Sequence, residues 1–201
     1  MERDDLHAFN EQWKDIENRY DPAIVQLRRV KPAAGTLARI AFDMDISGAK
    51  HPKSGLPSKF YVHRANEETL SRTDRLAGTV DILPDFPFAR PKVRFLNGQI
   101  PQHINVFRSG AMCIGGSEET VLSIMFDNIF RACIYDPDPS VANYSSAADS
   151  TARDWQKARE ASHDFPIMDP ARLFRRAKTA LPPVRRAGDP QNRSGLGPIR
   201  R

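Results

Sequence analysis

Four short runs between Thr36 and Leu96 alternate apolar and polar side chains, which is the pattern of a half-buried β-strand. The runs are TLARIAFDM, KFYVHR, GTVDIL and KVRFL. Gly, Pro, Asp and Asn fill the joins between them, as expected of turns, and short joins favour antiparallel neighbours. The sequence therefore predicts a four-stranded antiparallel meander.

Helical patterns flank these strands on both sides. Apolar residues recur at helical spacing near the N-terminus, at Leu6, Phe9, Trp13, Ile16 and Tyr20. Asp21-Pro22 predicts a second short helix reaching Val30, with Asp21 as N-cap. After the strands, Ser117 can cap a helix that continues to Cys133, and a last helix is expected from Asn143 to Glu160. Helices segregated from one antiparallel sheet define an α+β fold.

The charge distribution separates a body from a tail. The chain has a net charge of +5, yet residues 161–201 carry nine Lys or Arg against three Asp, so the first 160 residues have a net charge of −1. We expect a domain over 1–160 and a basic, Pro- and Arg-rich tail over 161–201, with a short helix at 169–181 and otherwise flexible. A body of this charge gives no sign of a specific nucleic-acid partner.

Targeting signals and cysteines suggest a cytoplasmic protein. The N-terminus lacks an apolar signal-peptide region, and no apolar run is long enough to span a bilayer, so no membrane partner is expected. Two cysteines cannot build a disulfide framework, which favours a reducing compartment. Cys133 falls on the apolar stripe of its predicted helix and is interpreted as a small hydrophobe, and no paired spacing predicts a metal site.

The other cysteine follows two polar residues at fixed distances. In QHINVFRSGAMC, Cys113 comes ten residues after His103 and eight after Asn105. This segment has neither a helical nor a strand period. It is either an ordinary loop that ends in a small apolar residue or a reactive thiol with polar side chains folded back beside it.

Three motifs in order give the segment a context. Each of them resembles a motif of the ubiquitin-conjugating enzymes. The aromatic-proline turn between that family's third and fourth strands is similar to LPDFPFARPKVRFL, and its His-Pro-Asn and cysteine signature is similar to HINVFRSGAMC. Its Asp-Pro-Asn-Pro segment is similar to DPDPSVAN. The similar elements run from about residue 76 to 160. Two departures are Ile104 in place of the signature proline and a shorter segment after Cys113, which lacks the family's tryptophan.

The resemblance implies a UBC-like fold: an N-terminal helix, a four-stranded antiparallel meander, an active-site loop and two C-terminal helices. Cys113 would accept a ubiquitin-like protein from an activating enzyme as a thioester and transfer it to a lysine of a target, with or without a ligase. No cofactor or metal is implied. The divergence is similar to that of bacterial conjugating enzymes encoded beside a ubiquitin-like protein.

The resemblance also suggests roles for single residues. Asn105 would stabilise the oxyanion or hold the loop, and His103 would brace the loop rather than act as a base. Phe88 either packs its turn or contributes to ligase docking. The gate position near the incoming lysine would fall at Ser140 or Val141, with Ser140 the better candidate. Asp136 and Asp138 are nearby acids, but Asp-Pro is also ordinary turn chemistry, so they are interpreted as turn residues.

Two other readings stay open. The chain could be a catalytically idle scaffold of the same fold, although it retains Cys113 and Asn105. It could also be a polyanion binder that acts through its basic tail, since a cationic tail attracts many polyanions without sequence preference. Loss of function on Cys113→Ala would distinguish a conjugating enzyme from such a binder.

Overall fold

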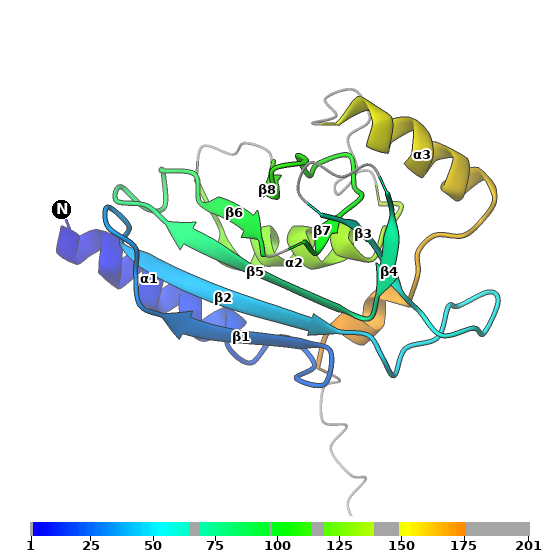
Figure 1. The fold of residues 1–201 in the computed structure, drawn as a ribbon. Helices are drawn as coiled ribbons and strands as arrows, with labels where there is room; N and C mark the ends of the chain where they lie inside the picture. The colour runs from blue at the N-terminus through cyan, green and yellow to red at the C-terminus, as the bar shows by residue number, and fades with distance from the viewer. Residues whose placement is uncertain (1, 65–68, 97, 114–118, 139–148, 176–201) are drawn as a thin grey trace, which may run out of the picture.

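The structure is a computed structural model, and it describes residues 2–64, 69–96, 98–113, 119–138 and 149–175. Figure 1 shows the helices and strands of an α+β fold. Three α-helices are described: α1 (Glu2–Ile16), α2 (Leu122–Cys133) and α3 (Ser150–Ala161). The strands are β1 (Val25–Val30), β2 (Ala38–Asp45), β3 (Phe60–His63), β4 (Ser71–Thr73), β5 (Arg75–Ile82), β6 (Lys92–Phe95), β7 (Ile100–Pro101) and β8 (Ala111–Met112). The predicted α+β class with an antiparallel sheet is confirmed.

The larger sheet has the strand order β1-β2-β5-β6-β8, and all of its pairings are antiparallel. Phe42 on β2 pairs with Gly78 on β5, and its ring reaches the ring of Phe95, with 5.7 Å between the centroids. A Cβ on Gly78 would overlap the Phe42 ring and lie 2.9 Å from the carbonyl oxygen of Arg94. Glycine is therefore required at this position for Phe42 to cross the neighbouring strand.

Helices α1 and α2 lie against each other behind the larger sheet (Figure 1). Their apolar stripes and alternate residues of β2 form one buried cluster, because helical and strand periods bring every third or fourth and every second residue to the core. The largest members include Phe9 and Ile16 of α1, Phe126 and Phe130 of α2, and Phe42 of β2. Each of these side chains is at most 1% exposed, so the core is closed to solvent.

The prediction of a short helix over residues 21–30 is wrong. Asp21 accepts backbone N–H groups from Ile24 and Val25, at 2.9 and 2.8 Å, but this makes a single turn. The chain then extends as β1, whose six residues pair with β2. Leu27 fits a helical and a strand period equally well, and pairing along the edge of the sheet decides in favour of the strand.

The four-stranded antiparallel meander is made of different strands from those predicted. The run at Lys59–Arg64 does form a strand, β3, but β3 belongs to a separate sheet with the order β4-β3-β7. Strands β2 and β5 are direct neighbours, and residues 46–74 leave the larger sheet between them. The consecutive antiparallel strands are therefore β1, β2, β5 and β6, of which the first was expected to be helical.

Helix α2 begins later than expected. Its N-cap is Val121, which has no side-chain cap, and Ser117 lies outside the described residues. Gln12 of α1 supplies the cap instead: its Oε1 accepts the N–H of Leu122 at 2.7 Å, and its Nε2 donates to the carbonyl of Thr120 at 3.2 Å. A distant side chain thus satisfies an N–H group that a local cap would serve.

The described part of the last helix starts at its own cap. Asp149 accepts the N–H groups of Thr151 and Ala152, at 2.8 and 3.0 Å, and α3 follows from Ser150. Residues 143–148, where the helix was expected to begin, lie outside the described residues.

The packed core continues past residue 160, the expected end of the domain. Phe165, Ile167, Met168 and Leu173 all belong to the buried cluster. The helix expected over residues 169–181 does start at Asp169, which caps it, but it is a 3₁₀ turn (Pro170–Leu173) that gives way to an extended Phe174 bridging to Tyr20. Packing on Tyr20 replaces helix propagation, and residues 176–181 lie outside the described residues.

Candidate active site

The segment after β7 folds into a small hairpin that ends at Cys113. Val106 and Met112 form an antiparallel bridge, and the N–H of Phe107 donates to the carbonyl of Ala111 at 2.8 Å. At the open end, the N–H of Cys113 donates to the carbonyl of Asn105 at 2.7 Å. The Cys113 thiol is exposed. The loop therefore presents a free thiol directly across from Asn105.

The hairpin turn requires one glycine. Gly110 has a φ of +84°, in the left-handed region that other residues rarely adopt, and its N–H donates to the carbonyl of Phe107 at 2.8 Å. Gly110 thus closes the turn that brings Cys113 back to Asn105.

His103 supports this hairpin from inside the protein. Its side chain is 1% exposed, and its Nδ1 accepts the N–H of Asn105 at 3.1 Å. Burial lowers the pKa of His103 to about 3, so the ring is neutral. Because Nδ1 accepts a hydrogen bond, the ring proton belongs on Nε2, which has no hydrogen-bond partner among the described residues.

This arrangement argues against His103 as a general base. A base must offer a lone pair to the proton that it removes, and the only lone pair of this ring is engaged by Asn105. Two hydrogen bonds link the three residues: the His103 ring accepts the backbone N–H of Asn105, and the Asn105 carbonyl accepts the backbone N–H of Cys113. These bonds support a bracing role for His103.

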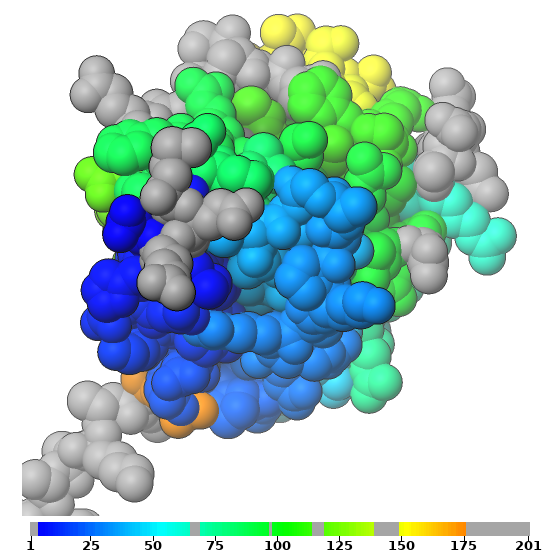
Figure 2. All heavy atoms as spheres, turned by 90° about the vertical axis from the view of Figure 1, so that its left-hand side faces the viewer, coloured from blue at the N-terminus to red at the C-terminus, as the bar shows by residue number. Residues whose placement is uncertain are grey.

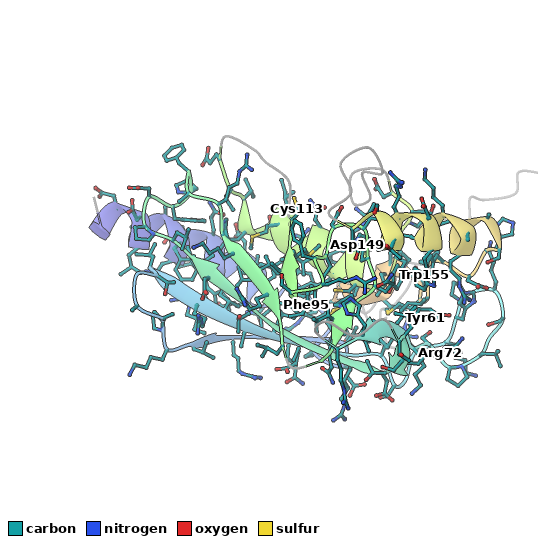
Figure 3. All side chains as sticks on the ribbon, turned by 45° about the horizontal axis from the view of Figure 1, so that its top comes forward. Tyr61, Arg72, Phe95, Cys113, Asp149 and Trp155 are labelled. Atoms are coloured by element: carbon teal, nitrogen blue, oxygen red, sulfur yellow. The ribbon has the colours of Figure 1, made fainter. Side chains whose placement is uncertain are left out.

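Helix α3 attaches the hairpin to the body, which the sequence analysis missed. The N–H of Asp149 donates to the carbonyl of Ile104 at 3.3 Å, and the Oε1 of Gln156, which is fully buried, lies 3.5 Å from the N–H of Ile104. The Asp149 carboxylate also pairs with Arg108 of the hairpin at 3.4 Å. Figure 3 shows Cys113 near the start of α3, where Asp149 is labelled. An Asp followed by Ser-Thr-Ala is a recognisable N-cap pattern and could have indicated this helix start.

The Asp-Pro segment after α2 makes a structural turn. Arg131 donates to Asp136 at 2.7 Å and to Asp138 at 2.8 Å, and the Asp136 carboxylate accepts the N–H of Asp138 at 3.1 Å. These bonds agree with the interpretation of Asp136 and Asp138 as turn residues. Ser140, the candidate for the gate position, lies outside the described residues.

The aromatic-proline turn before β6 presents two phenylalanines in opposite ways. Phe86 is 1% exposed and packs edge-on against Phe9, with 6.2 Å between the centroids, whereas Phe88 is 70% exposed. Phe86 therefore packs the turn, and Phe88 is available to a partner. The packing role proposed for Phe88 is therefore wrong, and its role in docking stays a prediction.

Cys133 is not part of this site. Cys133 is 2% exposed on α2, and burial raises the pKa of its thiol, so it is an unreactive apolar residue. Within the described parts of the chain, no group of three or more His, Cys, Asp and Glu residues could hold a metal ion.

Comparisons with known proteins add no identity. No protein-family model matches the chain, and a search of curated proteins finds no match. Among the described residues, no helix has the length and apolar character needed to cross a membrane.

Proposed function

We propose that the chain is a ubiquitin-conjugating-type enzyme that carries a ubiquitin-like protein as a thioester on Cys113 and transfers it to an amine of a target. The observation that carries this proposal is the hairpin that holds an exposed Cys113 across from Asn105, with a buried neutral His103 behind it. The order of the three sequence motifs adds to it.

The reaction has two steps. The Cys113 thiolate attacks the thioester carbonyl of the charged activating enzyme, a new C–S bond forms, and the thiolate of the activating enzyme leaves. A lysine amine of the target then attacks the same carbonyl, a C–N bond forms, and the C–S bond breaks with Cys113 leaving as a thiolate. The proton lost by the amine passes to that thiolate or to solvent. Both steps pass through a tetrahedral oxyanion.

The site suits a carrier better than a hydrolase. A hydrolase needs a base with a free lone pair beside its thiol to activate water, and His103 offers none. Because His103 cannot activate water in this way, we expect a thioester on the exposed thiol to persist until an amine arrives. Asn105 is the candidate donor to the oxyanion, since its amide N–H group needs no change of protonation state.

The amine itself must be prepared for the second step. A lysine with an ordinary pKa is neutral in only about one molecule in a few thousand at pH 7. We assign Ser140 to this step by resemblance, as the gate residue near the incoming lysine.

A partner surface lies at one end of the molecule. Leu6, Phe88 and Val121 are 44%, 70% and 41% exposed. Their segments are joined by hydrogen bonds from Asp85 N–H to the Asp5 carboxylate at 3.1 Å and from Thr120 N–H to the Pro87 carbonyl at 2.7 Å. Figure 2 looks onto this end, where α1 in dark blue lies next to green segments of the chain. We assign docking of the activating enzyme or a ligase to this surface.

Intact-mass measurement tests the proposal. The chain is incubated with an activating enzyme already charged with its ubiquitin-like protein, and its mass is measured with and without thiol reductant. We expect a reductant-labile adduct on the wild type, no adduct on Cys113→Ala, and a reductant-stable ester on Cys113→Ser. A wild type that gains no mass from a demonstrably charged activating enzyme would instead support the scaffold reading.

A further inference from the structure

The excursion between β2 and β5 builds a pocket of its own. Adjacent antiparallel strands usually need only a few connecting residues, and long connections in compact domains are commonly functional. Here residues 46–74 form β3 and β4 and contribute most of the wall of a surface pocket of about 240 Å³. The rest of the wall comes from Arg159, at the end of α3, and from the segment that follows it.

The pocket has one positive charge left over. Lys59 pairs with Asp74 at 2.7 Å, and Arg159 pairs with Asp164 at 2.7 Å. Arg72 also lines the pocket, is exposed, and has no ion pair with any described residue. The Nδ1 of His51 is occupied, because it accepts the N–H groups of Lys53 and Ser54 at 3.2 and 3.1 Å. Among the described Lys and Arg residues of the wall, Arg72 is therefore the one without an ion pair.

Tyr61 holds that cation in place. Tyr61 on β3 and Arg72 on β4 are cross-strand partners, and the Arg72 guanidinium lies 5.1 Å from the centroid of the Tyr61 ring. The Arg159 guanidinium lies 5.4 Å from the same centroid. Stacking on an aromatic face restrains a guanidinium and leaves its edge donors free for an acceptor. Two guanidiniums are thus gathered around one ring.

We propose that this pocket binds a carboxylate side chain of an extended acidic peptide segment in a partner protein. A single unbalanced positive charge matches a monoanionic carboxylate, and a guanidinium binds carboxylates through paired hydrogen bonds. Leu56 is 65% exposed in the pocket wall and offers an apolar contact to the residue next to the acid.

The pocket fits other anions less well. Nucleic acid and free phosphate carry more negative charge, and proteins meet them with several unpaired cations. The volume also falls below the usual range for small-molecule sites, about 300–1,000 Å³.

The position of the pocket suggests what such a segment would do. In Figure 3, Cys113, Asp149, Trp155, Tyr61 and Arg72 follow one another along the molecule. Cys113 lies near the start of α3 and the pocket near its end, and a helix of 12 residues is about 18 Å long. An acidic segment bound there would present a target from the far end of α3. This role rests on the proposed conjugating function, whereas binding of the segment does not.

Peptide titration of the isolated 201-residue chain tests the pocket. The probe is the capped hexapeptide acetyl-Gly-Ser-Glu-Leu-Ser-Gly-amide, and its matched control carries Gln in place of Glu. Binding is followed through the backbone amide signals of the protein in two-dimensional NMR. We expect the Glu peptide to shift the signals of Tyr61, Arg72 and Asp164, with a Kd on the order of 1 mM. The Gln peptide should bind about tenfold more weakly, because it loses a charge-assisted hydrogen bond.

Variants of the protein complete the test. Arg72→Gln should weaken the binding of the Glu peptide to the protein about tenfold. Arg94→Gln removes the same charge from an exposed position on β6 and should leave binding unchanged. Equal binding of the Glu and Gln peptides, or equal binding by wild type and Arg72→Gln, overturns the proposal. Tighter binding of inorganic phosphate than of the Glu peptide overturns it too. No thioester chemistry enters these measurements, so they fail or succeed independently of the function proposed for Cys113.

Discussion

The backbone carbonyl of Asn105 accepts the backbone N–H of Cys113 at 2.7 Å, so these two residues face each other across the open end of the hairpin. The bond uses only main-chain atoms. A substitution of the Asn105 side chain therefore leaves this link intact, as well as the link from the Asn105 N–H to His103. The side chain of Asn105 can thus be tested separately from its backbone.

Asn105→Ala should affect transfer more than loading. Removing one oxyanion donor costs about 10²–10³ in rate in well-studied cases, and the incoming amine is the weaker nucleophile at neutral pH. We expect loading of Cys113 within about threefold of the wild type and discharge to free lysine slowed by about 10²-fold. Single-turnover assays measure the two steps separately. Ser109→Ala, at an exposed position of the same hairpin, is the control and should leave both rates unchanged. Equal losses in both steps would assign Asn105 to the loop instead.

His103 should make the stability of the fold depend on pH. Its pKa is about 3 in the folded state and 6.5 in an unperturbed chain, so below pH 6.5 the unfolded state takes up a proton that the folded state does not. The free energy of unfolding should therefore fall as pH decreases from 6.5 towards 3, by roughly 1 kcal/mol per pH unit from this group. Above pH 6.5 it contributes nothing to the slope. Urea denaturation at several pH values measures the dependence.

His103→Gln isolates that contribution. The variant should be less stable at pH 7, by about 1–3 kcal/mol, because the N–H of Asn105 loses a well-placed acceptor. Its stability should also fall less steeply between pH 6.5 and 4. His7→Gln, at an exposed position of α1, should keep the wild-type slope. Parallel curves for His103→Gln and the wild type would exclude His103 as the titrating group.

Phe88 and Phe86 should give opposite results when each is replaced by Ala. Phe88 is 70% exposed, so Phe88→Ala should change the free energy of unfolding by less than about 0.5 kcal/mol. It should slow loading from limiting activating enzyme, or ligase-dependent transfer, by roughly tenfold. Phe86 is 1% exposed, and Phe86→Ala should destabilise the fold by about 3–5 kcal/mol. Normal rates in both assays with Phe88→Ala would remove Phe88 from the docking surface.

Truncation should show where the domain ends. A chain that stops at Arg175 keeps the buried residues of the C-terminal segment and should unfold cooperatively. A chain that stops at Glu160 loses Phe165, Ile167, Met168 and Leu173 from the core. At roughly 1.5–3 kcal/mol for each buried side chain, the loss is comparable to the whole stability of a domain, about 5–15 kcal/mol. We expect no cooperative transition in the shorter chain. Thermal denaturation followed by circular dichroism decides, and cooperative unfolding of the shorter chain would contradict the role given to the C-terminal segment.

The sequence predicted those elements whose signals are local. Helix α1 and strands β2, β3, β5 and β6 follow from apolar periodicity. The segment that ends at Cys113 was left open between an ordinary loop and a reactive thiol with polar side chains beside it, and its hairpin was not predicted. The failures share a physical cause, because distant partners determine them. β1 exists because β2 lies beside it, and α2 starts at Leu122 because Gln12 caps it.

The same cause limited the prediction of the site. Ile104, Arg108 and Asp149 meet only in three dimensions, since about 40 residues separate the hairpin from α3 along the chain. Exposure is also invisible in the sequence: Phe86 and Phe88 are two residues apart, and only the fold shows that one is buried and the other accessible.

The contact between the C-terminal segment and Tyr20 bears on how the chain folds as it is synthesised. The N–H of Asp21 donates to the carbonyl of Leu173 at 2.9 Å, and Leu173 is fully buried. At about 5–20 residues per second, a ribosome needs roughly 8–30 s to proceed from Tyr20 to Leu173. Throughout that time the site that Leu173 fills is open. The N-terminal part of the protein therefore cannot complete its packing around Leu173 until residue 173 has been synthesised.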